Sequence, residues 1–185
     1  CTLATFYREG LGLKKMPWPR QSGAERDEIK RAKDNVVFFD LHDPRQAAAY
    51  RTKVRAHLDT AASAGIPMVC LHVGRRVQML DPDRELCAAA AVLDEMAEYA
   101  HVRNIRVVLE MPHVWLLYHD VDRSRQMLGY LTSDNIGVLL DTSHWHTSDY
   151  DVEAYIDFLQ GRLWNVHLRD AAGKDSPGGD FLLEA

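Results

Sequence analysis

The sequence predicts an α/β domain built on a parallel sheet, and three observations lead to this prediction. Several short apolar runs show no alternation of polar and apolar residues, which is the pattern of strands buried on both faces. These runs alternate along the chain with longer segments of helical periodicity. Most of them end in a carboxylate or a histidine, which a strand with a purely structural role does not need. Because successive βα units fold with a right-handed crossover, we expect a parallel sheet, either open or closed into a barrel.

Five segments have the composition of strands. Residues 1–7 (CTLATFY) are rich in β-branched and aromatic residues. The clearest later strand is residues 138–140, a short apolar run that ends at Asp141. The same pattern predicts strands at residues 68–71, 105–109 and 163–166. The polar residues that close the four later strands are His72, Glu110, Asp141 and His167.

Helices are predicted between these strands. Each of the two long helices begins with an Asp-Pro pair, in which the aspartate is the N-cap and the proline lies in the first turn. Apolar residues then recur at helical spacing until a glycine or an asparagine ends the helix. The predicted helices are residues 43–65, 81–104, 120–131 and 149–159.

Residues 10–35 form a long predicted loop that is rich in Lys, Arg, Pro and Gly. Its Met-Pro-Trp-Pro sequence cannot continue a helix or a central strand. Loops of this length are often functional, but a surface insertion is the simpler interpretation.

Composition limits the classes of function. A chain of 185 residues with 46% hydrophobic residues is long enough for one domain with a sizeable core. A net charge of −5 gives no general attraction to nucleic acid. The three cysteines cannot all pair, and the absence of a signal-peptide pattern or a membrane-length apolar run makes a cytoplasmic protein the default expectation. Because the chain begins at Cys1, we expect it to be trimmed or part of a longer product.

The polar residues at the strand ends predict a common site. In parallel sheets and barrels the carboxyl ends of the strands lie on one face, where catalytic groups gather. His72, Glu110, Asp141 and His167 are separated by steps of 38, 31 and 26 residues, yet they are expected to converge there. Carboxylates and imidazoles presented together suit a divalent metal such as Mn²⁺, Co²⁺, Mg²⁺ or Zn²⁺.

The chain contains four short motifs, which are Val-Val-Leu-Glu110, Leu-Leu-Asp141-Thr-Ser-His144, Val-His167-Leu-Arg169-Asp170 and Pro177-Gly-Gly-Asp-Phe181. These motifs, in this order, resemble those of a known family, the xylose-isomerase-like TIM barrels, which include sugar phosphate isomerases and epimerases. The resemblance covers about two thirds of the chain, from Asp43 to Phe181. It implies a (β/α)8 TIM-barrel fold of which about five of the eight βα units are present, in a single partial domain spanning residues 1–185.

The resemblance implies a role for each matched position. Glu110, Asp141 and His167 correspond to three ligands of a divalent metal, for which Mn²⁺ is the first candidate, and Glu110 is also the candidate catalytic acid or base. The residues expected to contact substrate are His72, His144 and Arg169. The implied activity is isomerisation or epimerisation of a small sugar, sugar phosphate or hydroxy-ketone through an enediolate intermediate.

The sequence also departs from the family pattern. The fourth metal ligand, a glutamate at the end of the last strand, is expected beyond Asp180, and two strands are expected before residues 1–7. We therefore expect either a longer protein or completion of the barrel by another chain, and the question of a homo-oligomer stays open.

Other functions remain open at this stage. A DNA repair phosphodiesterase similar to endonuclease IV is the second candidate, and it requires further ligands and a basic groove. A lyase similar to inosose dehydratase and a domain without catalysis are the others. For individual residues, helix caps or salt-bridge partners are the alternative role of Glu110 and Asp141, and a hydrogen-bonded core histidine is the alternative role of His72.

Overall fold

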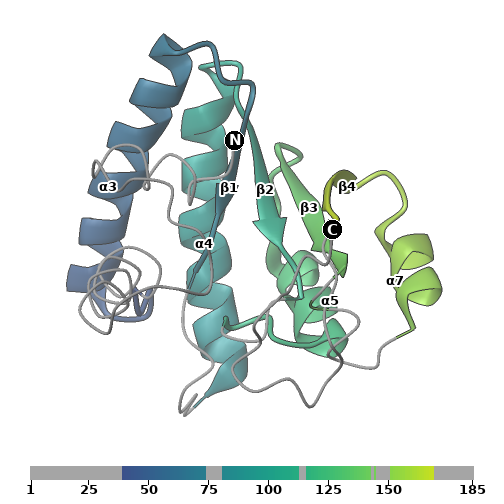
Figure 1. Cartoon of the computed structure of the whole chain (residues 1–185). Coiled ribbons are helices and arrows are strands. Elements are labelled where there is room, and N and C mark those ends of the chain that lie inside the picture. The colour runs from purple at the N-terminus through teal and green to yellow at the C-terminus, as the bar shows by residue number, and fades with distance from the viewer. Residues whose placement is uncertain (1–38, 74–80, 113–115, 143, 145–150, 169–185) are drawn as a thin grey trace, which may run out of the picture.

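The described part of the chain is a layered α/β structure. The computed structural model describes residues 39–73, 81–112, 116–142, 144 and 151–168. Within these residues the elements follow the order α3, β1, α4, β2, α5, β3, α7 and β4 (Figure 1). This regular alternation confirms the predicted fold class. The strand predicted at residues 1–7 and the loop predicted at residues 10–35 lie outside the described residues.

The described strands form a sheet in which every neighbouring pair is parallel and the spatial order is the sequence order, β1-β2-β3-β4. The predicted boundaries are right to within two residues. The closing carboxylates and His167 belong to the strands themselves, because Glu110 is in register with Leu139 and Asp141 with His167. The strands are β1 (Met68–Leu71), β2 (Arg106–Glu110), β3 (Ile136–Asp141) and β4 (Leu163–His167).

Each described helix begins at an aspartate N-cap. The side chains of Asp43, Asp81, Asp120 and Asp151 all accept a hydrogen bond from a backbone N–H in the first turn of their helices. The last helix therefore begins after Asp151, and the predicted start at residue 149 is wrong. None of the described helices is both long and apolar enough to cross a membrane. The helices are α3 (Pro44–Ser63), α4 (Pro82–His101), α5 (Val121–Tyr130) and α7 (Val152–Leu159).

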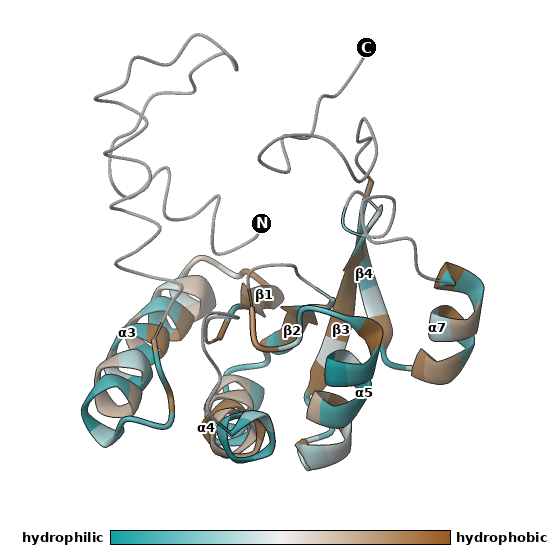
Figure 2. Ribbon diagram, turned by 90° about the horizontal axis from the view of Figure 1, so that it is seen from below, coloured by the Kyte–Doolittle hydropathy of each residue, from teal (hydrophilic) through white to brown (hydrophobic). Residues whose placement is uncertain are grey.

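The two faces of the sheet have different surroundings. Helices α3, α4 and α5 lie against one face (Figure 2), and the main hydrophobic core forms between them and the sheet. Alternate residues of β2, such as Val107 and Leu109, belong to this core and are fully buried. Because successive side chains of a strand point to opposite faces, Val108 and Glu110 point to the other face.

This other face carries a smaller apolar cluster of Cys70, Val108 and Leu139, against which Met68 and Trp164 pack. Each of the first three residues comes two positions before a polar strand-end residue. The polar strand-end residues therefore lie next to this apolar cluster, on the face of the sheet opposite α3, α4 and α5.

The ring of Trp164 packs directly on Gly137, where it leaves no room for a side chain. A Cβ atom built at Gly137 would lie 2.2 Å from Cδ2 of the Trp164 ring. The indole N–H donates to the carbonyl oxygen of Gly161 at 2.9 Å. The register of β3 against β4 also shifts between Val138 and Leu139, opposite this ring. Trp164 therefore packs closely on the strand next to it.

We predict that Gly137→Ala lowers the free energy of unfolding by about 1–3 kcal/mol, the usual range for an overpacked site. In a Trp164→Leu background the same substitution should cost much less, because the ring that it meets is gone. Urea unfolding of the two single variants and the double variant measures this coupling.

The control is Gly129→Ala in α5, where an added Cβ meets no atom within 4 Å. This change should be neutral or should stabilise the protein by up to about 1 kcal/mol, because alanine is the better helix former. Equal losses for Gly137→Ala with and without Trp164 would contradict the packing described above.

Candidate active site at the carboxyl ends of the strands

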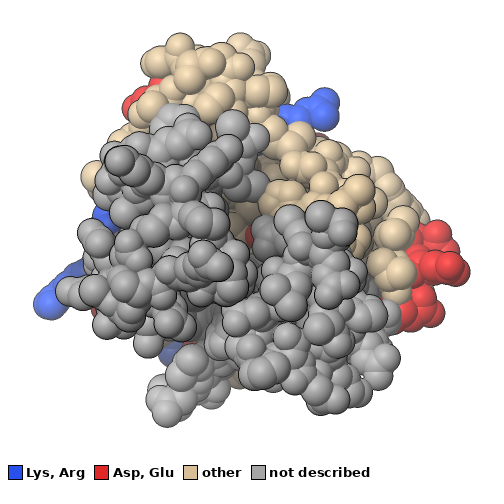
Figure 3. Space-filling view, viewed as in Figure 1, with Lys and Arg blue, Asp and Glu red and all other residues tan. Residues whose placement is uncertain are grey.

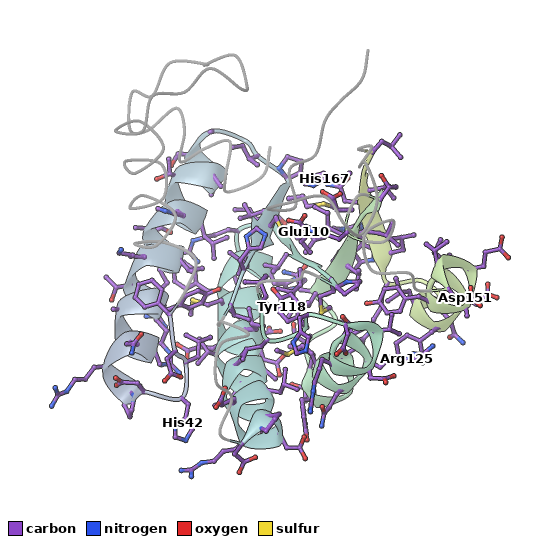
Figure 4. The ribbon with its side chains drawn as sticks, turned by 60° about the horizontal axis from the view of Figure 1, so that its bottom comes forward. His42, Glu110, Tyr118, Arg125, Asp151 and His167 are labelled. Carbon is purple, nitrogen blue, oxygen red and sulfur yellow. The ribbon has the colours of Figure 1, made fainter. Side chains whose placement is uncertain are left out.

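The structure brings five of the six predicted site residues together, namely His144 and the four residues that close the strands. His72 follows β1, while Glu110, Asp141 and His167 are the last residues of β2, β3 and β4. Glu110 and His167 lie near each other at the same end of the sheet (Figure 4). The convergence follows from the parallel order of adjacent strands, since each strand ends at the same edge. Arg169, the remaining predicted substrate contact, lies outside the described residues.

Glu110 is at the centre of the group. Glu110 as a whole is 6% exposed to solvent. One carboxylate oxygen, Oε2, lies 2.9 Å from Nε2 of His72. The other, Oε1, lies 3.4 Å from Nε2 of His144 and 3.9 Å from Nδ1 of His167. The two oxygens of one buried carboxylate thus face different partners.

Asp141 and His167 form the opposite side of the group. Asp141 is 1% exposed, and its Oδ2 atom lies 3.6 Å from Nδ1 of His167. The β3 strand ends at Asp141, and His144 follows three residues later, close enough to reach Glu110. His144 is buried as well. A carboxylate from β2, a carboxylate from β3 and two imidazoles therefore surround a small volume.

These residues fit a divalent cation. Burying two carboxylates close together is costly unless positive charge offsets them. Ligand atoms of Glu110, Asp141 and His144 all lie within 4.8 Å of one another. Nδ1 of His167 is buried and makes no hydrogen bond within the described part of the chain. Carboxylate oxygens and imidazole nitrogens are ligands for Mn²⁺, Co²⁺ and Zn²⁺.

The structure gives the third ligand position two candidates. The sequence assigns His167 to the metal and His144 to the substrate, whereas the compact set of ligand atoms includes His144. His167 lies 3.6 Å from Asp141 and 3.9 Å from Glu110, so both imidazoles are within reach of the same space. The division of roles between them stays a prediction.

His72 is a partner of Glu110 with an altered proton affinity. Burial by itself lowers the pKa of His72, but the neighbouring Cys70 and Glu110 outweigh burial and raise the pKa to about 10. The sequence analysis considers either a core histidine or a pocket histidine. The structure places His72 in contact with the central carboxylate, with its side chain 12% exposed.

Sequence reasoning did not single out Cys70. It lies in β1, two residues before His72, and its Sγ atom is 3.9 Å from Nε2 of that histidine. The signal was present in the period of two along the strand, which puts Cys70 and His72 on the same face. The thiol is therefore part of the surroundings of Glu110.

Comparison with known proteins identifies the family of the chain. Residues 22–181 match the family model described as "Xylose isomerase-like TIM barrel". The chain belongs to this family. The match covers most of the chain and includes all the strand-end residues named above. The fold is accordingly of the TIM-barrel type, with a parallel four-stranded sheet and alternating helices in the described part.

Individual relatives are more distant. Inosose isomerase of Bacillus subtilis (strain 168) is 21% identical over 150 residues, which are 80% of this chain and 53% of that protein. The chain thus spans about half the length of this curated relative. D-allulose 3-epimerase from Methylomonas sp. superposes with a TM-score of 0.64 at 17% identity, over 90% of this chain and 68% of that one. At this identity the similarity shows the fold alone.

A second structure, of the IolI protein with a zinc atom bound, has a TM-score of 0.64 and 17% identity. The aligned part is 91% of this chain and 67% of that chain. A protein of the same fold therefore holds a metal ion.

We predict that the chain binds Mn²⁺ with a stoichiometry of about one, and that Asp141→Asn and His167→Gln each weaken binding by at least about 10-fold to 100-fold. The reason is that each substitution removes a ligand or the group beside it. Equilibrium dialysis with elemental analysis measures both quantities. His101→Gln, at the end of α4 and exposed, should leave binding unchanged. Retained stoichiometric Mn²⁺ in both site variants would refute the ligand assignment.

We also predict a pH dependence of the stability of the metal-free protein. The folded-state pKa of His72, about 10, lies above its ordinary value of 6.5, so the folded state binds the proton more tightly. This contribution is complete below pH 6.5 and is lost as the pH rises from 6.5 to about 10. The free energy of unfolding should fall by up to about 1.4 kcal/mol per pH unit from this group. Urea unfolding between pH 6 and 10 should show a smaller slope for His72→Gln than for the wild type, whereas equal slopes would contradict the assignment.

Proposed function

We propose that this chain supplies the active site of a divalent-metal-dependent isomerase or epimerase that acts on a small sugar, sugar phosphate or hydroxy-ketone. The observation that carries the proposal is the buried Glu110 carboxylate, which has two imidazoles near one oxygen and His72 at the other. A carboxylate oxygen of Asp141 lies within 4.8 Å of this carboxylate. A base held beside a metal site is the arrangement that removes a proton from carbon next to a carbonyl.

Glu110, Asp141 and His167 would hold the metal, with Mn²⁺ as the first candidate and Co²⁺, Mg²⁺ or Zn²⁺ as alternatives. The ion, when bound, supplies a Lewis acid for two adjacent substrate oxygens. The Oε1 atom of Glu110 faces this group of ligands. The Oε2 atom, beside His72, is then the oxygen that is left to accept a proton.

The reaction proposed for these residues has two proton transfers. Glu110 removes the proton from the carbon next to the carbonyl, which gives an enediolate. Return of the proton by Glu110 to the neighbouring carbon gives an isomer, whereas return from the other face by a second acid gives an epimer. His72 would hold Oε2 in place and contact the substrate, while His144 and Arg169 would orient the oxygens of the substrate.

The family and its members support the sugar class of substrate. The curated relative is an inosose isomerase, and one superposed structure is a D-allulose 3-epimerase. On the face in Figure 3 the described acidic side chains gather at the edge where α7 lies, and the basic side chains are scattered. This charge distribution, with a net charge of −5, gives no reason to prefer a nucleic acid substrate. We further propose that the chain is one partial barrel domain and acts in the cytoplasm.

We predict that the Mn²⁺-loaded protein exchanges a carbon-bound proton of its substrate with solvent, and that Glu110→Gln slows this exchange by about 10²-fold to 10⁴-fold. Glutamine keeps the shape of the side chain but cannot accept the proton. Nuclear magnetic resonance of a panel of ketoses and hydroxy-ketones in D₂O detects the exchange.

His101→Gln is the matched control, because it also replaces a polar residue with glutamine, but at an exposed position on the surface. Its exchange rate should equal that of the wild type. An unchanged rate in Glu110→Gln would remove this residue as the base, and no exchange with any substrate in a metal-loaded wild type would speak against the function.

A further inference from the structure

A second group of metal-ligand residues lies on the other side of Glu110. It consists of Cys70, His72 and Glu110, whose ligand atoms all lie within 4.8 Å of one another. Cys70 and Glu110 are buried, and the side chain of His72 is 12% exposed. This group shares Glu110 with the site described above but contains a thiol, which that site lacks. The proposed function makes no use of this thiol.

The distances within the group suit a tetrahedral zinc ion. With a Zn–S bond of about 2.3 Å and Zn–N and Zn–O bonds of about 2.0–2.2 Å, tetrahedral ligands lie roughly 3.6 Å apart for S···N and roughly 3.4 Å for N···O. The observed Sγ···Nε2 distance between Cys70 and His72 is 3.9 Å. The Nε2···Oε2 distance between His72 and Glu110 is 2.9 Å. Each of these two distances differs from the value expected for zinc by about half an ångström or less. A small rotation of the side chains is enough to remove this difference.

Charge and ligand type also select the ion. A thiolate and a carboxylate carry two negative charges, so a divalent cation with these ligands gives a neutral complex, which is the form that burial favours. The thiolate is a soft ligand that prefers zinc to Mn²⁺ or Mg²⁺. The apolar neighbours of Cys70, which are Val108 and Leu139, keep the sulfur away from water. Three protein ligands are also the usual number where zinc keeps one position open.

We propose that Cys70, His72 and Glu110 form a second, zinc-selective metal site, in which the two oxygens of Glu110 face two different ions. The carboxylate geometry carries the proposal, since Oε2 lies toward His72 and Oε1 toward His144 and His167. Zinc at this site engages Oε2. If the proposed function is correct, this is the oxygen that accepts the proton, and zinc at the second site inhibits the reaction.

The test uses Co²⁺ as a probe of the second site, because a thiolate bound to Co²⁺ gives an intense near-ultraviolet charge-transfer absorption that oxygen and nitrogen ligands do not give. The protein is the full 185-residue chain with Cys1 and Cys87 replaced by serine, so that Cys70 is the one thiol left. We expect this absorption to saturate at one equivalent of the thiolate-bound ion. Native mass spectrometry should find two zinc ions.

Cys70→Ala should abolish the absorption and weaken zinc binding at this site by about 100-fold or more, while the chain keeps one zinc ion. Asp141→Asn should have the converse effect and keep the absorption. His72→Gln is the second variant, and it should reduce the absorption even if Cys70→Ala fails to fold, which circular dichroism would reveal. No thiolate absorption in folded protein with a single thiol, or equal zinc binding in the wild type and Cys70→Ala, would overturn the proposal.

The exchange assay separates this proposal from the proposed function. Exchange by the Mn²⁺-loaded protein should fall as zinc fills the second site, and Cys70→Ala should need at least ten times more zinc for the same inhibition. Full thiolate absorption with undiminished exchange would overturn the inhibitory role. Thiolate absorption in a protein that never catalyses exchange would support the zinc site and count against the proposed function alone.

Discussion

The burial of the Glu110 carboxylate is the constraint on which the site depends. A carboxylate that is 6% exposed needs polar partners. The described partners are His167 at the end of β4, His72 directly after β1 and His144 three residues after β3. Each partner is therefore held in place by the same sheet that buries the charge. The arrangement couples the stability of this end of the sheet to whatever cation or proton balances the carboxylate.

The sheet makes this arrangement possible because its strands are parallel and adjacent in sequence order. His72 and Glu110 are 38 residues apart in the chain, and yet their side chains are 2.9 Å apart. The two faces of the sheet have different roles. The face against α3, α4 and α5 carries the main apolar core, and the other face carries the smaller apolar cluster next to the polar strand ends. The close fit of Trp164 on Gly137 belongs to this second face.

Glu110 also connects the proposed function with the proposed zinc site. A single carboxylate with one oxygen toward His144 and His167 and the other toward His72 can serve as a base or as a bridge between two ions. It cannot do both at once, because coordination uses the lone pair that would accept the proton. The identity of the metals that reach this face therefore decides which role it has.

The sequence by itself determined the fold class, the four strands of the described part of the chain and the residues that close them. Uninterrupted apolar runs and Asp-Pro helix starts are local signals, and motif order added the family. Local signals were weaker for α7, which the sequence predicts from residue 149 and which begins after its N-cap Asp151. Only the tertiary structure showed that Cys70 joins the group around Glu110 and that His144 reaches Glu110. Distances between side chains on different strands depend on register and twist, which no local pattern in the sequence encodes.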